Sequence, residues 1–235
     1  MQKGKLYLVP NSLGNDDLTG VIPKQVFDIV NKIDHYIVEN IRTAAKFLKL
    51  AGINKPLKEL TFYVLNTNSK DSDITSYLDE AEGGKDIGLI SEAGLPCIAD
   101  PGSVIVKMAH EKGIQVIPLT GPSSILLALM ASGVNGQNFA FQGYLPIDKK
   151  ERRRKLKELE RKVKSDNQSQ IFIEAPHRND RLLEEFLENI SGELILSISK
   201  NLTMDTELIA SKTIEEWKQK KITLGKEPVI FILGK

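Results

Sequence analysis

Short apolar runs alternate with amphipathic segments along the first half of the chain. Five of these runs are typical of buried strands, at residues 5–9, 35–38, 60–65, 86–90 and 114–119. Apolar residues recur at helical spacing in the segments between them, at residues 23–32, 40–51, 72–81 and 104–113. Nearly continuous apolar strands that alternate with helices predict a parallel sheet covered by helices on both faces.

The pattern changes after Leu119. Helices are predicted at residues 120–133, 149–164, 178–190 and 213–219, and strands at residues 139–144, 170–175, 194–199, 206–211 and 228–234. A short loop separates residues 194–199 from 206–211, which favours antiparallel pairing, and Thr213 and Glu216 have capping-box spacing. We therefore predict an α/β protein with a parallel-sheet domain over residues 1–118, a mixed-sheet domain over residues 119–235, and a ligand site in the cleft between them.

Composition limits the possible functions. The chain has 235 residues, enough for two compact domains, and a formal net charge of +1, so any basic surface for nucleic acid must be local. Cys97 is the single cysteine, which excludes an internal disulfide and suits a reducing compartment. No apolar run reaches the roughly 20 residues of a membrane helix, and the first ten residues lack a signal-peptide core. We expect a cytoplasmic protein that binds no membrane.

Three loops follow predicted strands and are rich in turn-forming residues: PNSLGNDD (10–17), SEAGLPCIADPG (91–102) and TGPSS (120–124). Open α/β sheets bind ligands outside the carboxyl ends of their strands, where these loops must lie. The first loop contains one glycine, Gly14, so it matches neither the dinucleotide fingerprint nor the phosphate loop. The three histidines are scattered, so we expect no metal site.

Two of these loops have alternative interpretations. Residues 91–102 are either a tightly turned connection or a rigid backbone wall whose carboxylates receive a polar, partly cationic small molecule. Ser123 and Ser124 either satisfy the start of the next helix or leave its backbone N–H groups free to bind an anion.

The predicted helix at residues 149–164 carries ten Lys and Arg residues against three Glu residues. Leu156, Leu159 and Val163 fall at i, i+3 and i+7, so one face can dock while the rest stays exposed. Such a charged run is often only a solvated helix face. In a nearly neutral protein it can instead follow the phosphates of an RNA strand.

Six segments occur in a fixed order along the chain: LYLVPNSLGND, IVENIRTAAKFLKLAGI, GLISEAGLPCIADPGSVIV, VIPLTGPSSILLAL, GYLPIDKKERRRKL and IFIEAPHR. This set resembles the tetrapyrrole methylase superfamily, the class III S-adenosylmethionine (SAM) methyltransferases. Within it the chain most resembles the bacterial 16S ribosomal RNA 2′-O-ribose cytidine methyltransferases. The resemblance covers essentially the whole chain, and it implies two αβα domains, a homodimer, and SAM bound in the interdomain cleft.

The resemblance also implies roles for individual residues. The expected cofactor-binding residues are Leu13, Gly14, Ala93, Gly94, Leu95, Ile98, Ser123, Ser124 and Glu174. Attack by a ribose hydroxyl needs a proton acceptor, and the candidates at strand ends or in the loops beyond them are Glu39, Glu174 and His177. The expected RNA contacts are Arg42, Arg152, Arg153, Arg154 and Arg178.

Some of these candidates have simpler interpretations. Glu39 and Arg42 can be a local ion pair at a helix start, and His177 can be an exposed loop histidine beside Arg178. The chain also departs from the family pattern. Glu-Asp-Thr-Arg becomes Glu39–Arg42 (ENIR), and Ala-Arg-Glu-Leu-Thr-Lys becomes Ser199–Met204 (SKNLTM), which loses an Arg–Glu pair. The cofactor loops keep the family pattern better than the substrate side does.

The sequence thus predicts a SAM-dependent methyltransferase that methylates a ribose 2′-hydroxyl of ribosomal RNA, with the small ribosomal subunit as its partner. Two alternatives remain open. One is a small-molecule methyltransferase of the tetrapyrrole type, in which Arg42 and Arg178 would hold an acidic substrate. The other is a SAM-binding module that has lost catalysis, which the altered ENIR and SKNLTM segments suggest.

Overall fold

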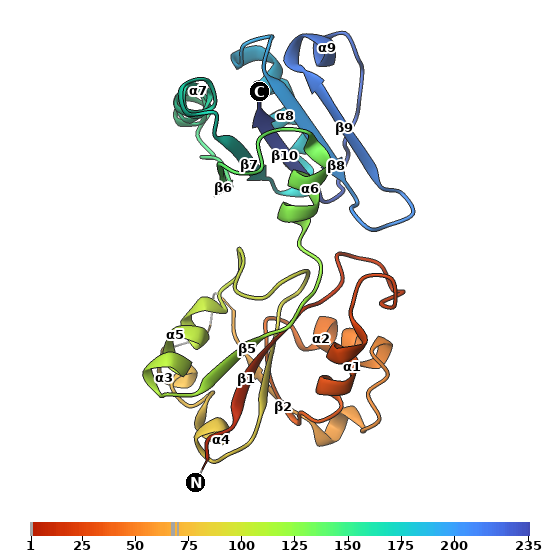
Figure 1. Ribbon diagram of the computed structural model, residues 1–235, viewed down its shortest axis with the longest axis vertical. Coiled ribbons are helices and arrows are strands. Elements are labelled where there is room, and N and C mark those ends of the chain that lie inside the picture. The colour runs from red at the N-terminus through yellow and green to blue at the C-terminus, as the bar shows by residue number, and fades with distance from the viewer. Residues whose placement is uncertain (1, 67–68, 70) are drawn as a thin grey trace. The chain divides into compact units, whose positions relative to one another are not determined.

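The computed structural model describes residues 2–66, 69 and 71–235. The chain divides into two compact units, Met1–Ser123 and Ser124–Lys235, each with its own sheet and core (Figure 1). The sequence placed the domain boundary between residues 118 and 119, before the TGPSS loop, whereas the division of the structure falls within that loop. No helix among the described residues has both the length and the low polarity needed to cross a bilayer.

The N-terminal unit is built on a five-stranded sheet with the order β3-β2-β4-β1-β5 and parallel neighbours throughout. Its strands are β1 (Lys5–Val9), β2 (His35–Val38), β3 (Thr61–Val64), β4 (Ile87–Ile90) and β5 (Gln115–Pro118). The helices are α1 (Lys24–Val30), α2 (Ile41–Leu50), η1 (Leu57–Glu59), α3 (Asp71–Ile74), α4 (Asp79–Glu82) and α5 (Ser103–Glu111).

Separate apolar cores lie on the two faces of this parallel sheet. Val26 and Val30 of α1 and Phe47 of α2 belong to one core. Ala81 of α4 and Ile105 of α5 belong to the other. The predicted parallel sheet with helices on both faces is confirmed, because each core needs a helical layer to exclude water.

The C-terminal unit contains a mixed sheet with the order β6-β7-β10-β8-β9, in which β6 and β7 are parallel and the other pairs antiparallel. Its strands are β6 (Phe139–Gly143), β7 (Ser169–Ile173), β8 (Ile195–Lys200), β9 (Leu208–Thr213) and β10 (Val229–Gly234). The helices are α6 (Ser124–Ser132), α7 (Lys149–Asp166), η2 (Pro176–Arg178), α8 (Asn179–Asn189) and α9 (Ile214–Lys218).

Helices cover both faces of the mixed sheet as well. Apolar residues of α7, α8 and α9, including Leu156, Phe186 and Trp217, form one core with alternate residues of the strands. On the other face α6 packs against β8, β9 and β10, and Ser211 of β9 donates to the carbonyl of Ser132 at 2.7 Å. The predicted mixed sheet, the β8–β9 pairing and the capping box at the start of α9 are confirmed.

Two predicted helices differ from the structure. The helix predicted at residues 72–81 is two short helices, α3 and α4, separated by a turn in which the hydroxyl of Tyr77 donates to the Val64 carbonyl at 2.6 Å. The helix predicted from residue 120 begins only at Ser124. Pro122 disfavours helical geometry at Gly121, the residue before it.

Buried Glu160 stabilises the C-terminal unit by joining α7 to the turn after α8. It accepts hydrogen bonds from Lys157 Nζ at 2.8 Å and from the Ser191 backbone N–H at 2.9 Å. Burial opposes its ionisation, but the hydrogen bonds from Lys157 and Ser191 outweigh burial and lower the pKa of Glu160 to about 2. Because this pKa lies below the ordinary value of 4.5, the stabilisation is complete above that value and is lost as the pH falls towards 2.

We expect Glu160→Gln to lower the free energy of unfolding of the C-terminal unit by about 1–3 kcal/mol at pH 7, the range for hydrogen bonds to a buried charged group. The difference from the unsubstituted protein should shrink between pH 4.5 and pH 2. Urea unfolding followed by fluorescence of Trp217, the single tryptophan, reports on this unit. Glu158→Gln removes only surface ion pairs and is the control; equal losses in both variants would contradict the prediction.

Candidate functional site

The loops that follow β1 and β4 are joined by their backbones at the carboxyl edge of the parallel sheet. The Asn11 N–H donates to the Gly94 carbonyl at 2.9 Å, and the Gly94 N–H donates to the Ser12 carbonyl at 3.4 Å. The side-chain amide of Asn11, which is buried, donates to the carbonyls of Ser91 and Glu92 at 3.2 and 3.0 Å. Asn11 thus fixes the loop after β1 against the loop after β4.

Two glycines allow the loops to approach this closely. Gly94 has a φ of +69°, and a Cβ there would lie 3.2 Å from the Leu13 side chain and 3.3 Å from the Pro122 carbonyl oxygen. A Cβ at Gly121 would overlap the ring of Pro10. At these two glycines the loops after β1, β4 and β5 meet too closely for an added Cβ, and we call the packed junction the backbone wall.

Asp100 holds the end of the loop that follows β4. Its carboxylate accepts hydrogen bonds from the N–H groups of Cys97, at 2.8 and 2.9 Å, and of Gly102, at 2.7 Å. Within this loop Cys97 and Ala99 adopt φ angles of 69° and 62°, a region that non-glycine residues rarely occupy. Burial raises the pKa of Asp100, and its effect is larger than the opposite effect of these hydrogen bonds. Burial, reinforced by Asp100, raises the pKa of the Cys97 thiol to about 11.

Glu39 directly follows β2 beside this wall, and its side chain is partly buried. It lines a small hollow with Ser91 and Asp100, and its carboxylate accepts from the Glu92 N–H at 3.2 Å. Burial, with smaller contributions from Asp100 and Glu92, raises the pKa of Glu39 against the effect of that hydrogen bond. A carboxyl group with a raised pKa is a stronger proton acceptor than an exposed one.

The structure does not support the local pair between Glu39 and Arg42. Within the described part of the chain no ion pair joins them. The Arg42 backbone N–H donates to the side chain of Asn40 at 2.8 Å, which caps α2, and the Arg42 side chain is exposed. Arg42 is therefore free to contact a ligand.

A larger hollow of about 470 Å³ lies beside the wall and collects several expected cofactor residues. Leu13, Gly14 and Ala93 line it, together with Asn11, Ser12, Asp16, Thr43, Lys46, Phe47, Leu50 and Glu92. Gly94 lies in the wall itself, while Ile98 is 51% exposed and lines none of the described hollows. Ser124 is the first residue of α6, and Ser123 precedes it in the connection between the units.

The remaining catalytic candidates lie in the C-terminal unit. Glu174 follows β7, is buried, and accepts from Arg178 Nε at 3.0 Å and from the Ala175 N–H at 2.7 Å. His177, which lies between Glu174 and Arg178 in the sequence, is exposed on η2. Because Arg178 neutralises Glu174, this carboxylate is less suited than Glu39 to accept a proton.

Arg152 was expected at an RNA surface, and the structure corrects this. The side chain is buried, forms a two-pronged ion pair with Glu185, and donates to the carbonyls of Pro146 and Ile147 at 2.8 and 2.6 Å. The hydrogen bonds to Glu185 outweigh burial and raise the pKa of Arg152. These contacts hold the Arg152 guanidinium inside the C-terminal unit.

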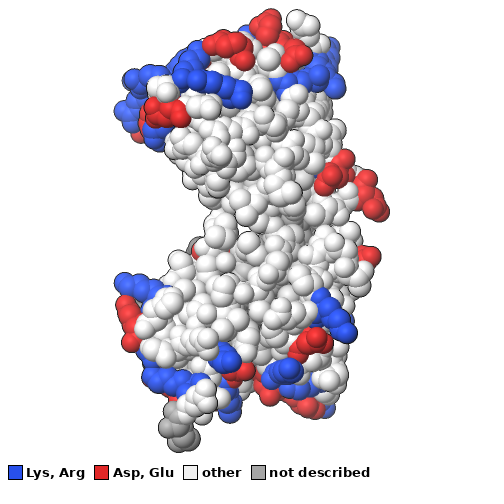
Figure 2. Space-filling model, viewed as in Figure 1, with Lys and Arg blue, Asp and Glu red and all other residues white. Residues whose placement is uncertain are grey.

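The exposed basic face of α7 contains other residues. Lys150, Arg154, Lys157 and Arg161 are exposed at i, i+4, i+7 and i+11, and we call them the basic stripe. Arg153 lies beside the stripe, 3.7 Å from Glu188. In Figure 2 Lys and Arg side chains gather where Figure 1 places α7. Among the described residues no group of three His, Cys, Asp or Glu side chains could hold a metal ion.

Sequence reasoning missed Asn11, Arg181 and Glu185. The signal for Glu185 was present, because its position in α8 shares the apolar face of Leu182 and Phe186. A charged residue at such a position needs a buried partner. Asn11 had no comparable signal, because its role depends on a loop 80 residues away in the chain.

The fold defines the class of this protein: it has two α/β units, and hydrogen-bonded loops lie outside the carboxyl ends of the parallel sheet. Similar solved structures include the methyltransferase CobJ, with a TM-score of 0.65 and 17% identity over 99% of this chain and 94% of that one. Another is uroporphyrin III C-methyl transferase from Thermus thermophilus, with a TM-score of 0.63 and 16% identity over 99% and 98%. At these identities the likeness shows the fold alone.

The chain belongs to the tetrapyrrole (corrin/porphyrin) methylase family, whose model matches residues 6–218. Relatives named ribosomal RNA small subunit methyltransferase I occur in several bacteria. The Bacillus subtilis protein is 36% identical over 91% of this chain and 68% of its own length. The Vibrio cholerae protein is 33% identical over 90% and 69%. The family resemblance predicted from the six ordered segments is thus confirmed.

We expect Gly121→Ala to lower the free energy of unfolding of the N-terminal unit by about 1–3 kcal/mol, because the added methyl group must push Pro10 away. Thermal and urea unfolding followed by circular dichroism measure the change. Gly20→Ala is the matched control, since a Cβ at Gly20 meets nothing within 4 Å. If the two variants are equally stable, the loops are not packed as described.

Proposed function

We propose that this protein is a SAM-dependent methyltransferase that methylates a ribose 2′-hydroxyl of small-subunit ribosomal RNA. The wall formed by the loops after β1, β4 and β5 is the observation that carries the methyltransferase assignment. The RNA target is supported by relatives at 33–36% identity that are named as ribosomal RNA methyltransferases. The tetrapyrrole enzymes are only 16–17% identical, so they give no comparable support for a tetrapyrrole substrate.

The residues of the wall fit SAM as a cofactor. A Cβ at Gly94 would press on Leu13 and on the Pro122 carbonyl, so this glycine lets the loops pack closely beside the hollow before a small molecule binds. Glu92 lines the adjoining hollow and favours a cationic ligand, whereas Asp16 is paired there with Lys46 at 2.7 Å. When bound, SAM supplies a methyl group on a positively charged sulfur. Leu13, Gly14, Ala93 and Gly94 would hold it, and Leu95, Ile98, Ser123, Ser124 and Glu174 remain proposed contacts from the family resemblance.

The chain's own contribution to methyl transfer is alignment and proton removal. Holding the hydroxyl in line with the methyl carbon and sulfur can lower the barrier by about 7–11 kcal/mol. We assign proton acceptance to Glu39, whose pKa is raised by burial. Glu174 and His177 are the weaker candidates because one is neutralised by Arg178 and the other is exposed.

RNA binding is assigned to exposed cations. Arg42, Arg153, Arg154 and Arg178 remain proposed contacts, and the basic stripe of α7 extends the set. Arg152 is removed from it because Glu185 holds this side chain inside the unit. We also propose that the protein acts in the cytoplasm as a homodimer. The apolar side chain of Met130 on α6 is 80% exposed, which suits such a contact.

Tritiated SAM incubated with small ribosomal subunits from a strain that lacks this protein tests the function. We expect label in the 16S RNA, at a linkage that resists alkaline cleavage because the 2′-hydroxyl is blocked. Label in a tetrapyrrole and none in RNA would support the small-molecule alternative. SAM binding without transfer to either acceptor would support the non-catalytic module.

We expect Glu39→Gln to lower kcat by about 10²–10⁴-fold, the usual contribution of a general base, and to change SAM affinity little. Activity of the unsubstituted enzyme should fall at low pH as Glu39 becomes protonated, at a pH above the ordinary carboxyl value of 4.5. The variant should lack this acidic limb. Glu59→Gln, on η1, is the control. A variant with normal kcat and the same pH profile would exclude Glu39 as the acceptor.

A further inference from the structure

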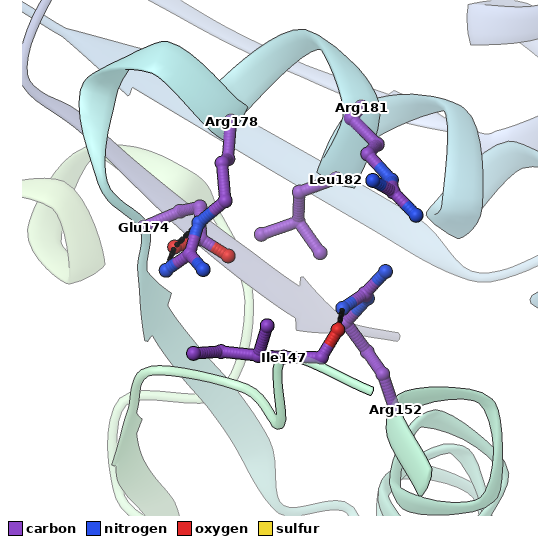
Figure 3. A pocket seen from close by; sticks show the side chains of 6 residues that line it. All are labelled: Ile147, Arg152, Glu174, Arg178, Arg181 and Leu182. Atoms are coloured by element: carbon purple, nitrogen blue, oxygen red, sulfur yellow. Dashed lines mark hydrogen bonds and ion pairs between the residues drawn. The ribbon is translucent and has the colours of Figure 1, made fainter. Parts of the chain in front are cut away.

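The C-terminal unit contains a hollow of about 290 Å³ beside the first turn of α8 (Figure 3). Its six lining residues come from η2, α8, the end of β7 and the segment around the start of α7: Ile147, Arg152, Glu174, Arg178, Arg181 and Leu182. Three of these six are arginines. We call it the arginine hollow.

The charges of the hollow are not fully balanced from within. Arg178 pairs with Glu174, and Arg152 and Arg181 share Glu185, with Arg181 Nε 3.5 Å from its carboxylate. Three guanidinium groups therefore face two carboxylates. The Arg181 side chain is 62% exposed and that of Arg178 is 29% exposed, so both can turn remaining N–H donors towards a ligand.

The start of α8 adds to the positive potential. Its N-cap residue, Arg178, makes no side-chain capping hydrogen bond. The acidic residue in the first turn, Asp180, is engaged elsewhere, because its carboxylate accepts from the backbone N–H groups of Leu224 at 2.6 Å and Gly225 at 3.2 Å. Two available guanidinium groups beside the helix start favour an anion, and a phosphate matches their paired donors.

The hollow also has an apolar side. Leu182 points into it between the arginines, and Ile147 lies across from Leu182 (Figure 3). The Ile147 side chain is 77% exposed, yet its backbone is fixed by Arg152, which donates to the carbonyls of Pro146 and Ile147. A buried ion pair therefore presents an apolar side chain to solvent at the mouth of a cationic hollow.

We propose that the arginine hollow binds one unpaired nucleotide of the substrate RNA. A phosphate lies beside Arg178 and Arg181, and the base packs against exposed Ile147. Arg152 is a positioning residue that holds Ile147 in place. Sequence-specific RNA recognition mainly targets such unpaired nucleotides. The inference rests on the proposed RNA methyltransferase function and names how that substrate is held.

Arg181→Gln is the main test variant. Glu185 keeps Arg152 as its partner, so this substitution strands no buried charge. The probe is a fluorescently labelled, single-stranded oligomer of ten cytidine nucleotides. We expect about tenfold weaker binding and a slope of log affinity against log salt that is smaller by about 0.7, the change for one lost phosphate contact in a single strand.

Ile147→Ala tests the apolar side separately. We expect weaker binding by several-fold with an unchanged salt slope, because no charge is lost. Lys24→Gln, at an exposed lysine of α1 in the N-terminal unit that does not line the hollow, is the matched control for the loss of one charge. The same oligomer paired with its complement should bind equally to all variants, since a duplex offers no unpaired base.

Three results would overturn the proposal: unchanged single-strand affinity in Arg181→Gln, equal losses for single strand and duplex, or loss of SAM affinity in that variant, which would assign the hollow to the cofactor. Inorganic phosphate that displaces the oligomer equally well from the unsubstituted protein and from Ile147→Ala would indicate a site for free phosphate. Failure of RNA methylation by the unsubstituted protein would refute the proposed function and leave these binding results to be judged independently.

Discussion

The backbone pairing of Asn11 with Gly94 is the constraint on which the N-terminal site depends. It joins loops that leave β1 and β4, neighbouring strands separated by about 80 residues of chain. Parallel strands bring such loops to one edge, but only a buried asparagine and a glycine with positive φ let them meet as paired backbone. Close contact then fixes the wall before any ligand arrives, so binding needs little ordering of the loops.

This rigid wall explains why two nearby carboxylates can have different roles. Burial raises the pKa of both Glu39 and Asp100. Asp100 accepts hydrogen bonds from two backbone N–H groups that hold a strained loop, so its oxygens are occupied. Glu39 accepts one longer hydrogen bond and retains acceptor capacity. Asp100 thus supports the loop, and Glu39 is left to accept a proton.

Much of the fold follows from local pattern. Buried strands of four to six residues leave a strong apolar signal, and both sheets were predicted from it. The errors occurred where tertiary contacts override periodicity. The apolar spacing through Ile74, Tyr77 and Ala81 suits one helix, but the Tyr77 hydroxyl bonds the end of β3 within a turn. Gly121 was assigned to a helix, although Pro122 disfavours helical geometry there and α6 begins only at Ser124.

The candidate site was less predictable because function depends on which face of an element is buried. Counting charges along α7 assigned Arg152 to the RNA surface. Its spacing from Leu156, Leu159 and Val163, however, is that of one helical face, a signal of burial that the charge count overlooked. What the sequence could not supply was the partner, because Glu185 lies on another helix.

Burial of the Arg152–Glu185 pair has a consequence for specificity rather than for stability alone. Desolvation offsets most of the attraction in such a pair, yet removing one partner strands the other charge at a cost of about 3–5 kcal/mol. The pair therefore fixes how α7 and α8 pack, since other registers leave a charge unpaired. Because Arg152 also binds the carbonyls of Pro146 and Ile147, that register sets the position of the loop before α7. Arg152, which was predicted to be a surface charge, is buried and determines the shape of the surface beside it.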